Sequence, residues 1–372
     1  MSTLKVDSIE SRTSGNRVVL PDVNNYSPFR NIIINGDMSV AQRATSASSI
    51  ASNGYHSCDR WRYAESSSAV VTISQATDVP TGQGFAKSFK VDCTTADASL
   101  GAAENVLLQQ KIEGQNLQYL KKGTSSAESL TLSFWVKSTK TGTFIAMLYD
   151  RDNTRQIAKS YTVSSSDTWE KKTITFAGDT SGTLDNDNAS SLELWLWLGV
   201  GSNYSSGTLA TSWETETAAN QAVGQVNAVD STSNNFLITG VQLEVGDSAT
   251  PFEFLPRDVN KNRCLRYFQD LAPKKNDCRI AIGENVSGTR CDPIFQYVEK
   301  RADPSVTFTA ANTFSLYNAA TSRDCSSISA DNFSKISGNL NANVSSGLTP
   351  TGGASQFITN GTGSQIFVDA EL

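Results

Sequence analysis

Apolar and polar residues alternate over short stretches along most of this chain. Alternation with a period of two is typical of a β-strand that buries one face. The pattern is clearest in residues 129–138, SLTLSFWVKS, and residues 191–200, SLELWLWLGV. The residues that share an apolar face are Leu130, Leu132, Phe134 and Val136 in the first stretch and Leu192, Leu194, Leu196 and Leu198 in the second. We expect these two faces to meet in the core.

The same pattern, bounded by Gly, Asn and Ser, predicts nine short strands between residues 31 and 245. They are NIIING, AVVTISQ, FAKSFKVDC, SLTLSFWVKS, GTFIAMLYD, QIAKSYTV, WEKKTITF, SLELWLWLGV and NNFLITGVQLEV. Few windows have a helical period. Many short strands separated by turn residues are typical of a β-sandwich or jelly roll, so the predicted fold class is all-β.

Residues 238–257, ITGVQLEVGDSATPFEFLPR, predict the last strand of this sandwich and the way it ends. One face of the strand carries Val241, Leu243 and Val245, and the other carries Gln242 and Glu244. Gly246 and Pro251 interrupt the alternation. We expect the segment that follows to be a hinge whose prolines, Pro251 and Pro256, restrict the backbone and fix the direction of the next domain.

A second, smaller β-domain is predicted after Arg257. RDVNKNRCLRYFQDL allows a short helical turn, and PSVTFTA, TFSLYN, SQFITN and SQIFVDAEL have the pattern of strands. A segment of roughly 100 residues is long enough for one core. The predicted organisation is an extended N-terminal arm over residues 1–30, a jelly roll over residues 31–257 and a C-terminal β-sandwich domain over residues 258–372.

The arm, residues 1–30, is rich in Ser and Asn and has only scattered apolar residues. Such a segment buries too little surface to fold alone. Two interpretations remain open: a disordered leader, or a segment that becomes ordered by pairing with another chain or with another copy of itself.

Composition restricts the partners. The chain has a net charge of -6 and a sequence pI of about 5.0, without a basic run between aromatic residues, so we expect no nucleic-acid partner. There is no stretch of 18 apolar residues and no apolar export signal at the N-terminus. We therefore expect a chain made in a cytosol and not inserted into a membrane. Six cysteines without a C-x-x-C pair are then expected to be reduced, buried thiols, and a zinc site is disfavoured.

Several stretches together resemble the carbohydrate-binding-like jelly roll of bacteriophage tail-fibre and related virion proteins, especially those of marine phages. They are NIIINGDMSVAQR, CDRW, SLTLSFWVKS, TWEKKTITF, ITGVQLEVGDSATPFE and CLRYF. The opening LKVDSI…SGNRVVLPD is similar to the virion-attachment arms of such fibres, and IFVDAEL is similar to their C-terminal strand.

This resemblance implies a virion structural protein, made in the bacterial host cytoplasm and commonly a homotrimer. It would be a tail-fibre-like subunit that contacts other virion proteins through its arm and presents β-domains to host-surface polysaccharide. A head-decoration or tail-adaptor protein without a receptor role is an alternative. The resemblance carries no catalytic residues over to this chain.

The sequence predicts no enzyme. His56 is the single histidine, and its neighbours Ser57 and Cys58 are too close along the chain to face it as nucleophiles. For the adjacent CDRW we expect an ion pair between Asp59 and Arg60, or between strands, beside a packed Trp61. A glycan depolymerase remains the enzymatic alternative, although the chain lacks the internal repeat of a long β-helix.

The resemblance also implies a candidate site for a structural calcium ion between the first and last strands of the jelly roll. It would involve the region of Asn35, Asp37, Gln242 and Glu244, with Asp37 and Glu244 as the candidate carboxylate ligands. The usual aspartate of the last strand is absent, and the alternative is that these are solvated turn and edge residues. No other cofactor is indicated.

Three tryptophans are the candidate contact residues. Trp195 and Trp197 lie opposite the leucine stripe of their strand, and Trp135 lies opposite Phe134 and its apolar neighbours. A bare patch of tryptophan on an outer face is costly. Three interpretations remain open: the rings stack on sugars, they pack against a neighbouring subunit, or the long loop over residues 199–235 covers them.

Overall fold

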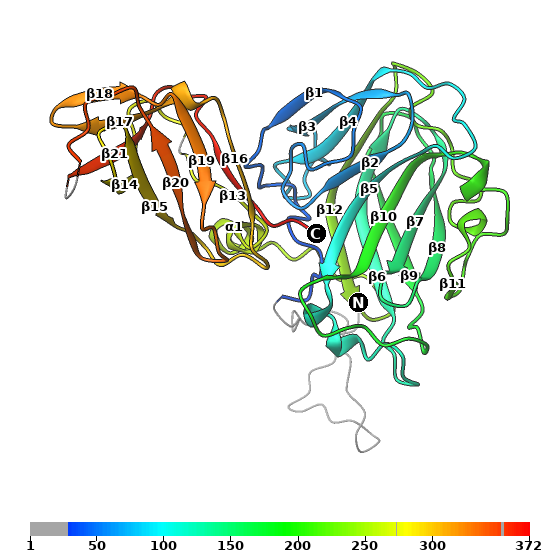
Figure 1. Cartoon of the computed structure of the whole chain (residues 1–372). Helices are drawn as coiled ribbons and strands as arrows, with labels where there is room; N and C mark the ends of the chain where they lie inside the picture. The colour runs from blue at the N-terminus through cyan, green and yellow to red at the C-terminus, as the bar shows by residue number, and fades with distance from the viewer. Residues whose placement is uncertain (1–28, 273, 351–352) are drawn as a thin grey trace, which may run out of the picture.

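A computed structural model describes residues 29–272, 274–350 and 353–372, and within them the regular structure is nearly all β. These residues form twenty-two strands, one α-helix and five short 3-10 helices (Figure 1). The predicted all-β class is confirmed. Residues 1–28 of the predicted arm lie outside the described residues. None of the helices described is long and apolar enough to cross a membrane.

Two six-stranded antiparallel sheets form the larger part of the molecule. The first sheet has the order β1-β3-β4-β12-β6-β9, with β1 (Ser46–Ile50), β3 (Val70–Ala76), β4 (Ser88–Thr95), β12 (Asn235–Val245), β6 (Leu130–Ser138) and β9 (Glu170–Phe176). The second sheet has the order β11-β8-β7-β10-β5-β2, with β11 (Glu214–Thr215), β8 (Arg155–Val163), β7 (Gly142–Asp150), β10 (Ser190–Val200), β5 (Asn105–Glu113) and β2 (Arg62–Glu65).

The predicted apolar stripes meet between these sheets. Leu132 and Phe134 of β6 and Leu194 and Leu196 of β10 have no exposed surface and belong to one core cluster. Burying a side chain of this size contributes about 1.5–3 kcal/mol. The alternation along each strand therefore determines which face of each sheet is internal.

The predicted strand NIIING is wrong, because residues 33–37 form bends and a turn. The backbone N–H groups here donate hydrogen bonds to side chains and not to a neighbouring strand. Asn31 accepts hydrogen bonds from Ile33 N (3.0 Å) and Leu243 N (3.1 Å), and Gln110 accepts one from Ile34 N (2.7 Å). Asn35 also has a left-handed backbone with φ of 57°. Local side-chain bonds of this kind compete with sheet formation.

Strand β5 is the most important strand that the alternation did not predict. It lies between β10 and β2, and its first residue, Asn105, is followed by the consecutive apolar residues Val106, Leu107 and Leu108. Leu108 faces the core between the sheets, whereas Leu107 faces a second apolar cluster on the outer side of its sheet. A strand buried on both faces has no period of two in its polarity.

Strand β12 lies in the middle of the first sheet, and the segment after it folds back onto the sandwich. Glu244 accepts hydrogen bonds from both the backbone N (2.8 Å) and the hydroxyl (2.7 Å) of Thr250. Gln242 Oε1 accepts one from Glu253 N (2.8 Å). Glu253 in turn accepts hydrogen bonds from the backbone N of Phe29 and of Asn31. We call residues 242–253, which contain QLEVG and ATPFE, the clip. Its hydrogen bonds hold the start of the described chain against β12.

The smaller part of the molecule begins with α1 (Arg257–Leu265) and contains two further antiparallel sheets. The three-stranded sheet consists of β13 (Phe268–Asp270), β22 (Ile366–Asp369) and β16 (Ser305–Phe308). The seven-stranded sheet consists of β18 (Thr321–Asp324), β17 (Phe314–Asn318), β21 (Ala354–Thr359), β14 (Arg279–Asn285), β15 (Arg290–Gln296), β20 (Ser337–Asn343) and β19 (Ser327–Asp331). Leu316, Leu340 and Phe357 are fully buried in its core. The predicted helical turn and the strands β16, β17, β21 and β22 are confirmed.

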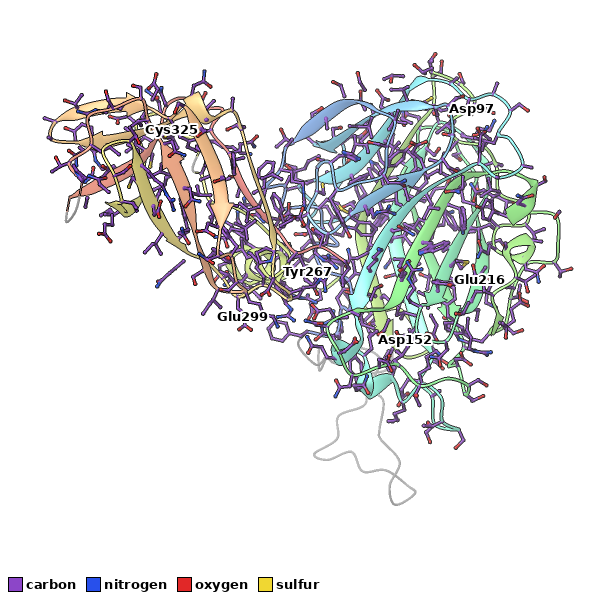
Figure 2. All side chains as sticks on the ribbon, in the orientation of Figure 1. Asp97, Asp152, Glu216, Tyr267, Glu299 and Cys325 are labelled. Atoms are coloured by element: carbon purple, nitrogen blue, oxygen red, sulfur yellow. The ribbon has the colours of Figure 1, made fainter. Side chains whose placement is uncertain are left out.

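The C-terminal residues join the two parts, and Figure 1 shows the C-terminus between them. Glu371 forms ion pairs with Arg60 and with Arg43, whose other guanidinium nitrogen lies 2.9 Å from Asp369. The Arg60 guanidinium also lies 3.5 Å above the ring of Tyr267, which Figure 2 shows at the junction. Charged and aromatic groups from both ends of the chain therefore fix the second part against the first.

Of the two ion pairs expected at CDRW, the one between Asp59 and Arg60 is not formed, and Arg60 pairs with the distant Glu371 instead. The carboxylate of Asp59 instead accepts hydrogen bonds from the backbone N (2.8 Å) and the side chain of Gln42. Adjacent residues project in different directions here, so the two charges meet different segments. Trp61 is fully buried as expected, and its indole donates to Asn35 O (3.1 Å).

All six cysteines are free, and five of them are buried. Burial raises the pKa of the Cys58 thiol far above its ordinary value and that of the Cys325 thiol to about 12. These side chains therefore act as small apolar residues of the core.

Candidate functional site

The long loop after β10 covers the tryptophans of the second sheet. Trp197 is 1% exposed and packs 5.8 Å from the ring of Tyr204, in a cluster that includes Ala210 and Ala222. Two short 3-10 helices, Ser202–Tyr204 and Ala218–Asn220, form part of this loop. A side chain with this exposure has no surface for a sugar or a neighbouring subunit.

Trp195 is half-buried at the edge of the same cluster. Its ring stacks 5.2 Å from that of Tyr149, and its indole donates to Glu193 (2.7 Å). The Tyr149 hydroxyl donates to Glu216 (2.7 Å), a residue of the covering loop that Figure 2 shows on this side of the sandwich. Of the three interpretations, coverage by the loop is the one that applies to this face.

Trp135 is in a different position, on the outer face of the first sheet. It lies across from Thr239 of β12 and Lys171 of β9, and it lines a hollow of about 490 Å³. The ring is half-buried, and its indole N–H has no hydrogen-bond partner among the described residues. Ser133, Lys171 and Thr250 add polar groups to the lining. An aromatic face beside a few polar groups is typical of a small-ligand site.

Three phenylalanines form an aromatic wall in the lining of this hollow. The ring centroids of Phe85, Phe252 and Phe254 lie 4.9–5.1 Å apart in each pair. They were missed in the sequence because Phe252 and Phe254 belong to the segment predicted as a hinge, and Phe85 lies more than 160 residues earlier. The folding back of the clip is what brings them to Trp135.

Gly240 allows this wall to form. Its φ of +62° and a register shift between Thr239 and Gln242 mark a β-bulge in β12. A Cβ at this position would lie 2.5 Å from the ring of Phe85. Only glycine combines the left-handed backbone with room for the aromatic ring.

A second hollow of about 380 Å³ lies farther along the same face. Asn235 and Leu237 of β12 and Lys90 of β4 contribute to its lining. Leu237 pairs with Lys137, which is two residues from Trp135 on the same side of β6. The outer face of the first sheet therefore carries two hollows.

A charged cluster lies at the second hollow, whose lining includes Asp78 and Asp167. Lys137 lies 2.9 Å from Asp78 and 3.0 Å from Asp167, and the Trp169 indole donates to Asp78 (2.9 Å). Burial opposes the charge of Lys137, but the two carboxylates outweigh it and hold the pKa of its amine above the ordinary value. The cluster stays charged near neutral pH and supplies fixed hydrogen-bonding groups.

The predicted calcium ligands have other partners. Asp37 accepts hydrogen bonds from Ser39 (3.1 Å) and Asn260 (2.9 Å), and Glu244 is occupied by Thr250 and lies 3.6 Å from Arg30. Within the described ranges, no group of three or more His, Cys, Asp or Glu side chains could hold a metal ion. The Glu244 carboxylate therefore holds Thr250 of the clip, and the Asp37 carboxylate holds Asn260 of α1.

His56 contacts the backbone of a nearby residue and not a nucleophile. Its Nε2 lies 3.1 Å from Ser52 O, and burial lowers the pKa of the ring. The thiol of Cys58 points to Met38 O (3.8 Å) and is completely buried. The imidazole is therefore not placed as a base for a nucleophile.

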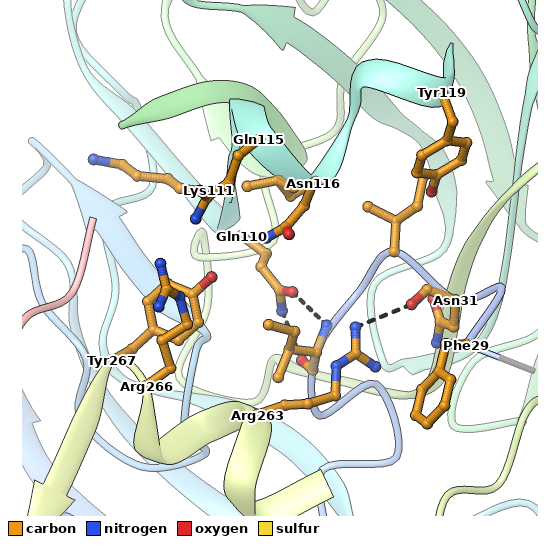
Figure 3. Close-up of a pocket in the computed structure, with 13 residues that line it drawn as sticks. Phe29, Asn31, Gln110, Lys111, Gln115, Asn116, Tyr119, Arg263, Arg266 and Tyr267 are labelled. Carbon is orange, nitrogen blue, oxygen red and sulfur yellow. Dashed lines mark hydrogen bonds between the residues drawn. The ribbon is translucent and has the colours of Figure 1, made fainter. Parts of the chain in front are cut away.

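A further cavity, of about 500 Å³, lies where the sandwich meets α1 (Figure 3). It is formed by residues 29–34, by the end of β5 with the 3-10 helices Gly114–Asn116 and Gln118–Leu120, and by α1. Sequence reasoning missed this cavity because its walls come from three distant segments.

Comparison with protein-family models gave no match, and comparison with curated proteins gave none either. Solved structures do match. One is the enzymatically active domain of tailspike protein 4 of bacteriophage CBA120, with 15% identity and a TM-score of 0.33, covering 59% of this chain and 22% of that chain. Another is a family 11 carbohydrate-binding module from Clostridium thermocellum in complex with a β-1,3-1,4-mixed-linked tetrasaccharide, with 14% identity and a TM-score of 0.27, covering 56% of this chain and 96% of that chain.

A third match is a putative sugar-binding protein from Bacteroides thetaiotaomicron VPI-5482, with 13% identity and a TM-score of 0.31. It covers 58% of this chain and 100% of that chain. The match thus spans less than a quarter of the tailspike chain but nearly all of each carbohydrate-binding or sugar-binding protein.

Proposed function

We propose that this protein is a phage virion structural protein, a tail-fibre-like subunit that binds host-surface polysaccharide through the outer face of its first sheet. The observation that carries the binding role is the hollow at Trp135, whose indole N–H has no partner among the described residues and which three phenylalanines help to line. The C–H faces of sugar rings pack well on aromatic rings, and the hydroxyl groups then need polar partners nearby. Ser133 and Lys171 supply them.

The virion role is supported by the resemblance of the jelly-roll stretches and of the N-terminal arm. In this proposal the arm, residues 1–30, contacts other virion proteins, and the chain forms a homotrimer. Three weak sites on a common axis bind a repetitive surface tightly because each bound site raises the effective concentration of the next. Light scattering on the purified protein measures the mass, and a monomer at micromolar concentration would contradict self-assembly of the isolated chain.

The binding role is tested by replacing Trp135. An array of bacterial surface polysaccharides identifies a ligand, and calorimetric titration measures its affinity for the wild type, for Trp135→Ala and for the control Trp195→Ala. Loss of a central aromatic contact costs about 2 kcal/mol or more, so we expect Trp135→Ala to bind at least about tenfold more weakly. Trp195→Ala should bind like the wild type.

Two results would contradict this proposal. One is an unchanged affinity in a folded Trp135→Ala protein, and the other is the absence of any polysaccharide ligand. A reducing-sugar assay on the same ligand separates binding from cleavage. Release of reducing ends by the wild type would support a glycan depolymerase in place of a binding protein.

A further inference from the structure

The cavity between the sandwich and α1 has an excess of positive charge. Its lining includes Lys111, Arg263 and Arg266 and contains no aspartate or glutamate. Arg266 is neutralised by a two-pronged contact with Glu113, at 2.8 and 2.7 Å. Among the described residues, neither Lys111 nor Arg263 forms an ion pair, so no carboxylate is in direct contact with these two cations.

Arg263 is the cation best placed to meet a ligand. Figure 3 shows its guanidinium group rising from α1 between Gln110 and Asn31. Its one hydrogen bond to a described residue goes to Asn31 O at 3.2 Å, which leaves most of its five N–H donors available. Burial lowers the pKa of Arg263, so its charge is only partly hydrated. A partly desolvated guanidinium forms strong paired hydrogen bonds with a carboxylate.

The rest of the lining suits a sugar ring. Phe29 and Tyr119 are 61% and 51% exposed, and Figure 3 shows both on the same side of the cavity. The side-chain amide of Asn116 has no hydrogen-bond partner among the described residues. Exposed aromatic faces, an amide without a partner among the described residues and a cation together match the apolar face, the hydroxyl groups and the carboxylate of an acidic sugar.

We propose that this cavity binds an acidic sugar, of the uronic or nonulosonic acid class, whose carboxylate contacts Arg263. The ring lies against Tyr119 and Phe29, and Asn116 hydrogen-bonds a hydroxyl group. This site is separate from the hollow at Trp135 and is independent of the proposed function there. It lies between the two parts of the chain, so an occupied cavity also contacts α1 and the sandwich together.

The experiment is calorimetric titration of the full chain with sodium D-glucuronate, D-galacturonate and N-acetylneuraminate. D-glucose, D-galactose and inorganic phosphate are the comparison ligands. We expect at least one acid to bind about tenfold or more tightly than its neutral counterpart and than phosphate. Equal binding of all three acids and of neutral hexoses would overturn the proposal. Phosphate binding as tight as that of the acids would show a general anion site instead.

Variants locate the site. Arg263→Gln should lose about tenfold in affinity for the acid, whereas Lys261→Gln, which removes the same charge from the exposed side of α1, should change it less than about twofold. Tyr119→Ala, at the exposed mouth, should also weaken binding and serves as the test if Arg263→Gln fails to fold.

Equal losses of affinity in Arg263→Gln and Lys261→Gln would overturn the role of Arg263. A loss of acid binding in Trp135→Ala would place the ligand at the other hollow and overturn the proposal as well.

Discussion

Asp59 and Arg60 are adjacent, buried and charged, and each is stabilised by a different segment of the chain. Asp59 accepts two hydrogen bonds from Gln42, whereas Arg60 contacts Glu371, the carbonyl of Lys111 and the ring of Tyr267. Burial raises the pKa of Asp59 from 3.8 to about 6, because the hydrogen bonds and Arg43 only partly offset the loss of hydration. A carboxylate of this kind makes stability depend on pH.

Asp59→Asn should change that pH dependence. Between pH 3.8 and about 6 the folded protein binds more protons at Asp59 than the unfolded chain does. The stability contributed by this group is therefore present at low pH and is lost as the pH rises through 6. We expect the wild type to lose up to about 3 kcal/mol relative to Asp59→Asn between pH 4 and pH 7. Urea unfolding of both proteins at several pH values measures this difference, and a constant difference would contradict the assignment.

At the scale of elements, strand β12 organises the candidate site. Its bulge at Gly240 allows Phe85 to approach the backbone, and its last residues, Gln242 and Glu244, hold the segment that carries Phe252 and Phe254. The same element therefore shapes one wall of the Trp135 hollow and closes the clip at the start of the described chain.

Gly240→Ala should cost more stability than the same change at Gly82. Gly82 has a similar φ of +76°, but a Cβ there meets no atom within 4 Å, whereas at Gly240 it meets the Phe85 ring. The left-handed backbone costs about 1–2 kcal/mol at either position. Steric crowding adds about 1–3 kcal/mol at Gly240 alone. Urea unfolding of the two variants measures the difference, and equal costs would show that Phe85 moves aside freely.

At the scale of the whole molecule, the last residues of the chain hold the two β-parts together. Arg301 donates to the carbonyls of Ala370 (2.7 Å), Glu371 (3.0 Å) and Asn188 (3.0 Å), and Arg43 and Arg60 converge on the side chain of Glu371. The direction of the second part is thus fixed by this interface. That the prolines after β12 also contribute to this direction stays a prediction.

Glu371→Gln should weaken the junction. It leaves the buried guanidinium of Arg60 without its anion, and breaking a buried ion pair in this way costs about 3–5 kcal/mol. We expect a lower midpoint of urea unfolding and a larger radius of gyration in X-ray scattering as the two parts separate. Glu299→Gln, an exposed acid near the junction (Figure 2), is the control and should change stability by less than about 0.5 kcal/mol. Equal effects of the two variants would contradict the role of Glu371.

The sequence by itself determined the all-β class, the inward faces of β6 and β10 and the helical turn that became α1. These features depend on the local period of polarity, which neighbouring residues carry. Tertiary structure decided what depends on distant partners: the bends at Asn31 in place of a strand, the double burial of β5, the loop over Trp197 and the pairing of Arg60 with Glu371. It also decided the site, because Phe85, Trp135 and Phe254 come together only when the segment after β12 folds back. No local pattern specifies which distant side chains meet, since that follows from how the sheets pack.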